Sequence, residues 1–266
     1  SETDSEVVLN SWSEWGEDCV NKFNGMFAFS IWDNKEKVLY LVRDRYGIKP
    51  LYYSQNGDFF LFGSEQRAIL KHPSFSFEVD KKGLIEYFTF QNLFTDRTLT
   101  KDIKILKAGS IAKIQANKSK PISIKKYWDY NFQESTAEIS KEDYQRELNR
   151  LLKQAVKRQL MSDVELGSYL SGGMDSGTIV SLASEDLPNL KTFTCGFDMS
   201  SASGIELKFD ERNKAAELSK LYGTEHFDMI LGASDMESSL SKVAKHLEEP
   251  RVGQSYPNFF ASKLAS

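Results

Sequence analysis

One short stretch constrains the fold of this chain more than any other: residues 168–176, Ser-Tyr-Leu-Ser-Gly-Gly-Met-Asp-Ser. An apolar-leaning run over residues 164–170 predicts a strand, and residues 177–184 can continue as a helix. A Ser-Gly-Gly turn that opens onto a helix exposes backbone N–H groups, and the helix N-terminus favours negative charge there. The stretch therefore predicts a strand–loop–helix unit that binds pyrophosphate, with glycines that permit close approach to the main chain.

Two other phosphate-binding loops do not fit this stretch. No Gly-Lys-Ser/Thr ending supplies the lysine of a Walker A loop, and no Gly-x-Gly-x-x-Gly pattern supports a dinucleotide fold. The remaining alternative is a glycine turn capped by Asp175 or Ser176 at a helix start. The flanking strand and helix favour the phosphate loop over this alternative.

Composition limits the classes of partner. The chain has 266 residues, enough for two domains, and a net charge of −4 at pH 7. No basic stretch resembles a nucleic-acid-binding surface, and no apolar run resembles a membrane span or a signal peptide. Cys19 and Cys195 argue against a disulfide framework and favour a reducing, cytoplasmic setting, with both side chains expected to be buried. The three histidines show no spacing typical of a zinc site.

Residues 1–130 have the pattern of an antiparallel α+β domain. A helical stripe over residues 5–15 follows a capping-box pattern at residues 3–6, and Gly16 suits its end. Short apolar runs between polar turns predict strands, and a helix is predicted near residues 82–90; the strands are expected over residues 26–32, 38–42, 51–53, 59–62, 110–114 and 122–127. Trp12, Trp15 and Trp32 are expected in the core. A polar stretch over residues 131–140 predicts a linker.

Residues 141–266 alternate helices with strands. Ser140 is placed to cap a long amphipathic helix with an apolar stripe from Leu148 to Leu160. Strands are predicted over 164–170, 191–197 and 224–231, and helices over 210–222 and from 234 and 257. Strands separated by helices predict a parallel sheet with right-handed crossovers. Ligands of such sheets bind beyond the carboxyl ends of the strands, where Ser171 falls.

The motifs resemble those of a known family. Ser-Gly-Gly-x-Asp-Ser resembles the signature of the ATP pyrophosphatase superfamily, whose members split ATP between the α- and β-phosphates. Residues 23–33, 42–53 and 62–65 look like class II glutamine amidotransferases, and residues 193–197 and 209–211 look like a synthetase domain. In this order the segments are similar to the glutamine-hydrolysing asparagine synthetase family over nearly the whole chain. The resemblance implies an incomplete Ntn-hydrolase-like αββα sandwich over residues 1–130, and an incomplete Rossmann-like α/β ATP-pyrophosphatase domain over residues 141–266.

The resemblance also implies two reactions that share ammonia. The first domain would hydrolyse glutamine to glutamate and ammonia. The second would use ATP and Mg²⁺ to adenylate the side-chain carboxylate of aspartate, releasing pyrophosphate, and ammonia would then displace AMP to give asparagine. The loop would stabilise the charge that builds on the departing pyrophosphate. The expected partners are therefore glutamine, aspartate and ATP, and a homodimer of the full-length protein stays open.

The resemblance assigns ATP and pyrophosphate binding to the loop and two strand ends: Tyr169, Leu170, Ser171, Gly172, Gly173, Asp175, Ser176 and Cys195. The serines would donate hydroxyl hydrogen bonds, whereas the anionic Asp175 would act through Mg²⁺ or fix the loop. Tyr169 and Cys195 are explained equally well as buried strand residues. Gly177 departs from the family pattern, in which a second serine is usual.

Several charged residues have a second assignment. Asp4 matches the family's aspartate that pairs with the α-ammonium of glutamine, although the charge also suits a helix start. Asp210 and Glu211 are expected to be a helix cap and a first-turn carboxylate rather than substrate ligands. A dense charged cluster is either a structural ion-pair network or a contact between domains, and the sequence leaves both open: Arg43, Asp44, Arg45 and Lys49.

Both termini are expected to be truncated relative to the family. Class II glutaminases use an amino-terminal cysteine as nucleophile, and Ser1 aligns downstream of that position. Cys19 lies in a region that the family does not use for chemistry. The sequence therefore predicts no catalytic residue for glutamine hydrolysis, and neither glutaminase nor complete synthetase activity in this chain. Two other functions stay open: an amidotransferase that acts on another acceptor, such as a sugar carboxylate, and a non-catalytic binding or regulatory module.

Overall fold

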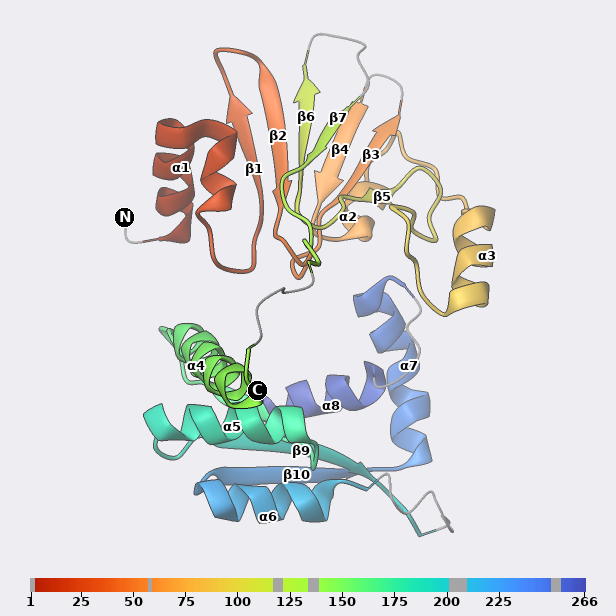
Figure 1. Cartoon of the computed structure of the whole chain (residues 1–266). Helices are drawn as coiled ribbons and strands as arrows, with labels where there is room; N and C mark the ends of the chain where they lie inside the picture. The colour runs from red at the N-terminus through yellow and green to blue at the C-terminus, as the bar shows by residue number, and fades with distance from the viewer. Residues whose placement is uncertain (1–2, 57–58, 117–121, 134–138, 201–209, 250–254) are drawn as a thin grey trace. The chain divides into compact units, whose positions relative to one another are not determined.

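The computed structural model describes residues 3–56, 59–116, 122–133, 139–200, 210–249 and 255–266. The chain divides into two compact units, residues 1–133 and 134–266. This division falls inside the polar stretch over residues 131–140. The first unit has antiparallel sheets and the second has a parallel sheet (Figure 1). None of the helices in the described ranges is both long and apolar enough to cross a membrane.

The first unit contains two antiparallel sheets. One has the order β1-β2-β6-β7, formed by β1 (Ala28–Asp33), β2 (Val38–Arg43), β6 (Ser110–Gln115) and β7 (Ser123–Lys126). The other has the order β4-β3-β5, formed by β4 (Phe59–Gly63), β3 (Tyr52–Asn56) and β5 (Lys104–Ile105). Every strand predicted in this unit is present. The two-residue strand β5 was not predicted, because two residues carry no periodic pattern.

The helices of the first unit are α1 (Asp4–Trp15), a 3-10 helix (Gly16–Asn21), α2 (Gln66–Leu70) and α3 (Lys81–Phe90). Gly16 ends α1 with a φ of 56°, as predicted, because glycine adopts positive φ without strain. The predicted capping box is wrong: Thr3 is the N-cap residue of α1, but its side chain makes no capping hydrogen bond. At the start of α3, by contrast, the Asp80 side chain is an N-cap that accepts the backbone N–H groups of Lys82 and Gly83.

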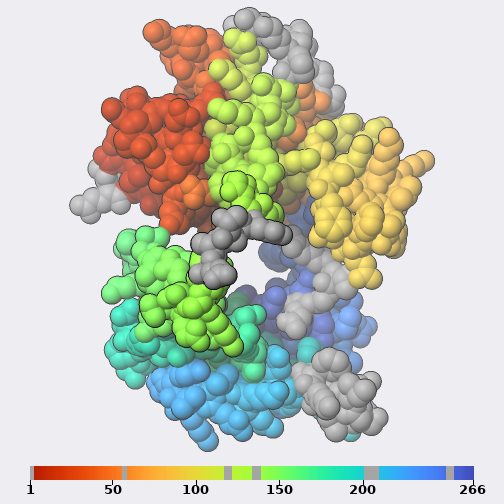
Figure 2. Space-filling view, viewed as in Figure 1, coloured from red at the N-terminus to blue at the C-terminus, as the bar shows by residue number. Residues whose placement is uncertain are grey.

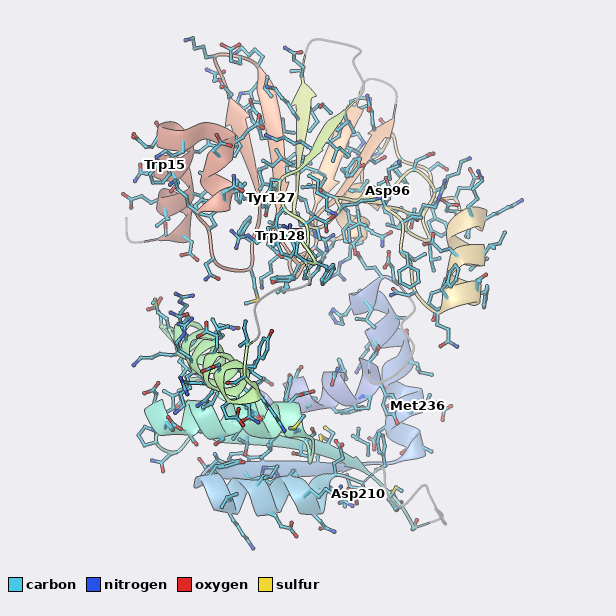
Figure 3. The ribbon with its side chains drawn as sticks, in the orientation of Figure 1. Trp15, Asp96, Tyr127, Trp128, Asp210 and Met236 are labelled. Carbon is cyan, nitrogen blue, oxygen red and sulfur yellow. The ribbon has the colours of Figure 1, made fainter. Side chains whose placement is uncertain are left out.

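The core of the first unit corrects the predictions for tryptophan. Trp12 packs against the buried cluster, with its ring centroid 5.0 Å from that of Tyr40. Trp15 and Trp32 are 47 % and 48 % exposed, so the prediction of core positions is wrong for both. Trp32 follows Ile31 in β1, and adjacent strand residues point to opposite faces of a sheet. Trp15 lies in the last turn of α1 (Figure 3), where the Lys22 ammonium lies 4.7 Å from its ring.

Arg43 shapes the loop that follows β2. Its buried guanidinium donates to three carbonyl oxygens, those of Lys49 (2.8 Å), Leu106 (2.6 Å) and Gly47 (2.6 Å). Burial lowers the pKa of Arg43, and the neighbouring Asp44 carboxylate offsets part of that shift. Gly47 has a φ of 63°, and a Cβ there would lie 3.0 Å from Arg43 Cζ.

Asp44 organises the same loop from its other side. Its carboxylate is 1 % exposed and accepts four backbone N–H groups, with Oδ1 taking those of Tyr46 (3.1 Å) and Ile48 (3.0 Å), and Oδ2 taking those of Lys49 (3.0 Å) and Phe27 (3.3 Å). Arg43 and Asp44 therefore hold the backbone of their own unit through hydrogen bonds to its carbonyl and N–H groups.

The second unit is a parallel three-stranded sheet with helices. Its elements are α4 (Lys141–Gln159), β8 (Gly167–Tyr169), α5 (Met174–Asp186), β9 (Lys191–Phe197), α6 (Arg212–Tyr222), β10 (Glu225–Leu231), α7 (Ala233–Leu247) and α8 (Ser255–Ala265). The strand order is β10-β9-β8, with β9 and β10 side by side in Figure 1. The strand predicted over 164–170 is shorter, because its pairing with β9 begins at Gly167. α5 begins earlier than predicted, at Met174, so the end of the loop motif is helical.

Side chains of the second unit show which helices cover each face of its sheet. Thr192 of β9 faces α6, since its hydroxyl lies 3.1 Å from that of Thr224, which donates to Ser219 of α6 (2.9 Å). Thr192 Oγ1 also lies 3.0 Å from Nδ1 of His226. Phe197 of β9 lies on the opposite face, with its ring 6.2 Å from that of Tyr256 in α8. The sheet is therefore covered by α6 on one face and by α8 on the other.

The long helix α4 is only partly packed. Ser140 caps it as predicted, with its hydroxyl accepting from the Asp143 N–H (3.1 Å). Val156 and Leu160 pack against the buried cluster formed by Leu170, Val180, Ala183, Leu190 and Ala215. The rest of the predicted stripe does not reach this core: Leu148, Leu151 and Leu152 are exposed. The side chains of α4 stand on the surface of the second unit, in green in Figure 2.

Candidate functional site

The Ser-Gly-Gly loop starts from a fixed point at the end of β8. Leu170 is buried, and its N–H donates to the carbonyl of Phe193 in β9 (3.0 Å). The Leu170 carbonyl in turn accepts the hydroxyl of Thr194. The position predicted as part of the binding loop is thus an anchor, because both of its backbone groups are held by the neighbouring strand.

Two serine hydroxyls hold the shape of the loop. The Oγ atoms of Ser171 and Ser176 lie 2.8 Å apart, and the N–H groups of Ser171 and Gly173 donate to Ser176 Oγ (3.1 Å) and Ser171 Oγ (3.2 Å). A ligand would therefore have to replace a bond within the loop to receive either hydroxyl. The structure brings the predicted residues Ser171, Gly173 and Ser176 together around one turn.

The loop opens onto a helix end with no side-chain cap. Gly173 is the N-cap residue of α5, and a glycine has no side chain that could accept the first N–H groups. Asp175 and Ser176 lie inside the first turn, so the alternative in which one of them caps the helix is wrong. The first N–H groups of a helix have no intrahelical acceptor, and those of Met174, Asp175 and Ser176 find no other among the described residues. They form the positive end of the α5 dipole.

The two loop glycines have separate reasons to be glycine, and neither has a positive φ. A Cβ at Gly173 would lie 3.1 Å from Ser171 Oγ. A Cβ at Gly172 would lie 2.6 Å from Cβ of Lys214, a residue in the first turn of α6 that the sequence did not indicate as part of the site. The sequence did not indicate Lys214 because its contact with Gly172 joins residues that are far apart in the chain. The one local hint is that a cation in the first turn of a helix is unusual.

Asp210 and Arg212 form an ion pair at the start of α6. Asp210 lies there in Figure 3, and its Oδ1 and Oδ2 accept from Nε (2.9 Å) and Nη2 (2.7 Å) of Arg212. The hydrogen bond from Arg212 lowers the pKa of Asp210. Asp210 also accepts the Arg212 N–H (3.2 Å), which is the cap-like role predicted for it. Glu211 is the N-cap residue but makes no side-chain capping bond, so that part of the prediction is corrected.

Tyr169 and Cys195 occupy the sheet face opposite α6. Tyr169 pairs in register with Phe193, two residues before Cys195 in the same strand, so the two side chains share a face. The Tyr169 hydroxyl lies 2.6 Å from the hydroxyl of Ser262 in α8. Tyr169 is 50 % exposed and Cys195 is partly buried, so neither is a fully buried strand residue.

Asp175 is the carboxylate available at the loop. It is exposed in the first turn of α5. No three His, Cys, Asp or Glu side chains gather into a metal site within the part of the chain that the structure describes. Mg²⁺ at phosphate sites is commonly bound through one or two carboxylates together with substrate phosphates and water. A single exposed carboxylate beside unpaired N–H groups is a donor set that could share Mg²⁺ with a phosphate ligand.

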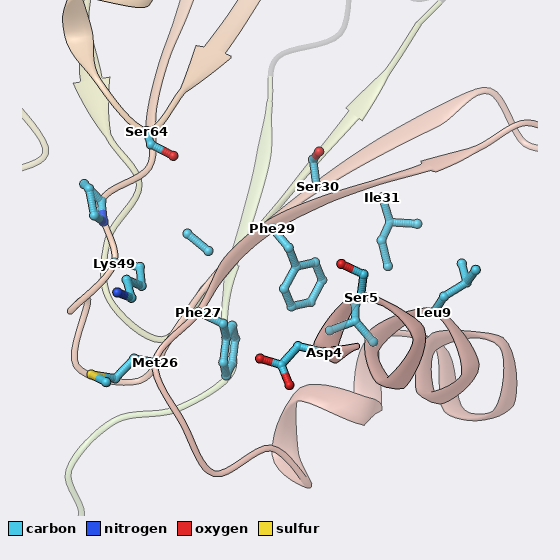
Figure 4. A pocket seen from close by; sticks show the side chains of 13 residues that line it. Asp4, Ser5, Leu9, Met26, Phe27, Phe29, Ser30, Ile31, Lys49 and Ser64 are labelled. Carbon is cyan, nitrogen blue, oxygen red and sulfur yellow. The ribbon is translucent and has the colours of Figure 1, made fainter. Parts of the chain in front are cut away.

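A cavity of about 630 Å³ in the first unit contains Asp4. Asp4 and Ser5 line it from α1, and Lys49 and Ser64 line it from across the cavity (Figure 4). Its remaining wall is largely apolar and includes Phe27, Phe29 and Ile31. One carboxylate and one ammonium on opposite sides of an apolar cavity suit a zwitterionic amino acid. Lys49 was assigned by sequence to a charged cluster, and its place in this cavity had no sequence signal of its own.

The cysteines have the environment of structural residues. Cys19 is fully buried in the 3-10 helix after α1, and burial raises the pKa of its thiol. Burial also raises the pKa of Cys195. A nucleophilic cysteine needs a lowered pKa, because the thiolate is the reactive form. Neither cysteine is prepared for nucleophilic attack.

Comparisons with known proteins match both units. A glutamine amidotransferase domain model matches residues 1–128, and an asparagine synthase model matches residues 147–266. Asparagine synthetase [glutamine-hydrolyzing] 1 of Bacillus subtilis (strain 168) is 33 % identical over 266 residues, covering 100 % of this chain and 40 % of the relative. Asparagine synthetase [glutamine-hydrolyzing] 3 of the same organism is 33 % identical over 264 residues, covering 96 % of this chain and 41 % of the relative.

A third relative, from another organism, has a similar level of identity to this chain. The putative asparagine synthetase [glutamine-hydrolyzing] 2 of Methanocaldococcus jannaschii is 32 % identical over 268 residues, covering 99 % of this chain and 50 % of the relative. The chain spans about half or less of the length of these relatives. The order of the two matched domains is the order of the motifs in the sequence. The chain belongs to the family of glutamine-hydrolysing asparagine synthetases.

Proposed function

We propose that this chain is part of an enzyme that makes asparagine from aspartate, with ATP as the source of activation and glutamine as the source of ammonia. The observation that carries the proposal is the loop after β8, where an uncapped helix end lies at the carboxyl edge of a parallel sheet. Free N–H groups and the helix dipole at this point suit a pyrophosphate. The glutamine amidotransferase match over residues 1–128 supports ammonia as the nucleophile.

The proposed reaction has two steps. An oxygen of the aspartate side-chain carboxylate attacks the α-phosphorus of ATP, the bond from that phosphorus to the bridging oxygen breaks, and pyrophosphate leaves. Ammonia then attacks the acyl carbon of β-aspartyl-AMP, AMP leaves with the bonding electrons, and a proton passes to solvent. The N–H groups of Met174, Asp175 and Ser176 would stabilise the departing pyrophosphate, because they point to a fixed place and need no reorganisation.

Mg²⁺ is proposed to accompany ATP, with the Asp175 carboxylate as its protein ligand. When bound, the ion would neutralise part of the charge on the phosphates. Tyr169 and Cys195 are proposed to border the nucleoside part of ATP from the face of the sheet opposite α6. For Tyr169 this requires that the nucleotide share or displace its hydrogen bond to Ser262.

The first unit is proposed to bind glutamine in the cavity that contains Asp4. The Asp4 carboxylate would pair with the α-ammonium, and the Lys49 ammonium lies across the same cavity as a partner for the α-carboxylate. The two antiparallel sheets of this unit support an Ntn-hydrolase-like sandwich, and the parallel sheet of the second supports a Rossmann-like ATP-pyrophosphatase fold.

We further propose that the 266-residue chain alone does not hydrolyse glutamine, because neither Cys19 nor Cys195 has an activated thiol. The measurement is glutamate release after incubation with glutamine. Release above the background of a heat-denatured sample would contradict this proposal.

The proposed synthesis is tested with the protein at the full length of its relatives. Pyrophosphate release from ATP is measured with aspartate, without aspartate, and with a sugar carboxylate in its place. Release that requires aspartate, with asparagine as product, supports the proposal. Release with the sugar carboxylate alone would identify another acceptor, and no release under any condition would favour a non-catalytic module.

A further inference from the structure

The side chain of Lys214 lies directly on the phosphate loop. A Cβ placed on Gly172 would come within 2.6 Å of Lys214 Cβ and 2.8 Å of Lys214 Cδ. Such distances are shorter than carbon–carbon contacts between side chains, which lie near 3.5–4.0 Å. Glycine at position 172 therefore makes room for the lysine stem, and the contact links α6 to the turn between β8 and α5.

The contact with Gly172 keeps the ammonium of Lys214 near the Ser-Gly-Gly loop. Nζ is two bonds beyond Cδ, which places it within about 2.5 Å of that atom. Since Cδ lies 2.8 Å from the position of a Cβ on Gly172, Nζ lies within about 5 Å of that position whichever rotamer the last two bonds adopt. The uncapped N–H groups of α5 begin two residues after Gly172.

The Ser-Gly-Gly loop itself has no positively charged side chain that could attract a pyrophosphate. Residues 171–177 contain one charged side chain, the Asp175 carboxylate, and no lysine or arginine. Mg²⁺ held by Asp175 would offset part of the charge of a bound pyrophosphate, and these residues supply no further positive charge for the rest. Lys214 also stands in the first turn of α6, where a cation opposes the helix dipole, so its position is not explained by the stability of its own helix.

The neighbouring cation cannot take this role. Arg212 lies in the same helical turn, and its side chain covers Gly196 in the way that Lys214 covers Gly172. Its guanidinium is held by both oxygens of Asp210. Lys214 has no carboxylate within 4.0 Å in the part of the chain that is described. The first turn of α6 thus carries one neutralised cation and one available cation.

We propose that Lys214 binds the pyrophosphate group of the nucleotide and supplies the positive charge that the Ser-Gly-Gly loop lacks. The lysine approaches from α6 while the N–H groups of α5 approach from the loop, so the anion lies between two helices. This inference rests on the proposed function of the loop and names a further binding residue for it.

The test measures binding of inorganic pyrophosphate with Mg²⁺ to the complete 266-residue chain by isothermal titration calorimetry. Lys214→Gln is expected to weaken binding at least tenfold at low salt and to flatten the dependence of affinity on KCl concentration, because one ionic contact is lost. Lys220→Gln, a matched change in the last turn of α6, is expected to bind as wild type. Ser176→Ala is expected to weaken binding, which shows that the loop is the site measured.

Each outcome decides the proposal. Equal affinity and equal salt dependence of wild type and Lys214→Gln would overturn the role of Lys214 and leave the loop intact. Absence of pyrophosphate binding by the wild-type chain, or binding that Ser176→Ala does not change, would overturn the proposed function of the loop as well. Thermal melting of each variant separates loss of the charge from loss of the fold, and Lys214→Arg is expected to restore most of the affinity and salt dependence.

Discussion

Replacing Asp44 by asparagine removes a charge but keeps the shape of the side chain, so it tests how the loop after β2 is held. The two carboxylate oxygens of Asp44 accept two backbone N–H groups each. Asparagine has one acceptor oxygen, and its NH₂ group would face two N–H donors. Two of the four hydrogen bonds are therefore lost in a site that is 1 % exposed, where water cannot replace them.

The expected cost follows from these two bonds. A hydrogen bond to a charged group contributes about 1.5–3 kcal/mol, so two of them give about 3–6 kcal/mol. Small domains have free energies of unfolding of about 5–15 kcal/mol, so Asp44→Asn is expected to remove a large share of the stability of the first unit. With a urea m-value of about 2 kcal/mol/M, the midpoint of unfolding falls by about 2 M.

Tryptophan fluorescence reports the first unit within the complete chain. All four tryptophans lie in residues 1–133: Trp12, Trp15, Trp32 and Trp128. Urea unfolding followed by this signal therefore measures Asp44→Asn without separating the units. Far-UV circular dichroism reports both units, and the transition of the second unit is expected to stay in place.

Asp33→Asn is the matched control. Asp33 accepts the N–H groups of Lys35 and Glu36 through a single oxygen, Oδ1, at 2.9 Å each. Asparagine keeps such an oxygen, so this variant is expected to change stability by less than about 0.5 kcal/mol, as most surface substitutions do. If Asp44→Asn lowered stability no more than Asp33→Asn, the reasoning from the four N–H groups would be refuted.

Three further changes probe the second unit. Burial lowers the pKa of His226 from its ordinary value of 6.5, so the folded state favours the neutral imidazole. Unfolding followed by circular dichroism should therefore show full stability above about pH 6.5 and a progressive loss of stability as the pH falls below it. His226→Gln should reduce this loss of stability at low pH. Gly196→Ala places a methyl group 2.4 Å from Arg212 Nε and should cost about 1–3 kcal/mol in urea unfolding; an unchanged midpoint would show that Arg212 moves aside freely. Ser140→Ala removes the cap of α4 and should lower helicity and cost about 1 kcal/mol. Ser140→Asn keeps an acceptor for the Asp143 N–H and a donor for its carboxylate, so helicity and stability should be retained.

Local patterns in the sequence were sufficient for most elements. The bounds of β9 are those predicted, because an apolar run between polar turns has one consistent pairing. Gly16 ends α1 and Ser140 begins α4 for reasons that depend on neighbouring residues alone. The Ser-Gly-Gly motif was placed correctly between a strand and a helix, since its own residues determine the turn.

Features that depend on distant residues were not predictable. The apolar stripe of α4 shows that one face is suited to packing, but the extent of the partner surface decides that Val156 is covered and Leu148 is not. Helical spacing likewise predicts Trp15 in the core, but it does not show how far the partner surface extends, and the side chain is exposed. The contact between Gly172 and Lys214 depends on how α6 packs, which no local pattern encodes.

The hydrogen bonds and packing at both ends of α6 lower the entropic cost of binding a ligand at the Ser-Gly-Gly loop. Near its carboxyl end, Ser219 exchanges hydrogen bonds with Thr224, and at its start the Arg212 side chain is clamped between Asp210 and the backbone at Gly196. A helix held at both ends cannot swing, so the stem of Lys214 is already in place before an anion arrives. Folding therefore already restricts most of the Lys214 side chain, and anion binding restricts only the rotation of its last bonds. The entropic cost of binding is correspondingly small. Changes that loosen α6 far from the loop, such as Ser219→Ala, should therefore weaken anion binding without touching the anion.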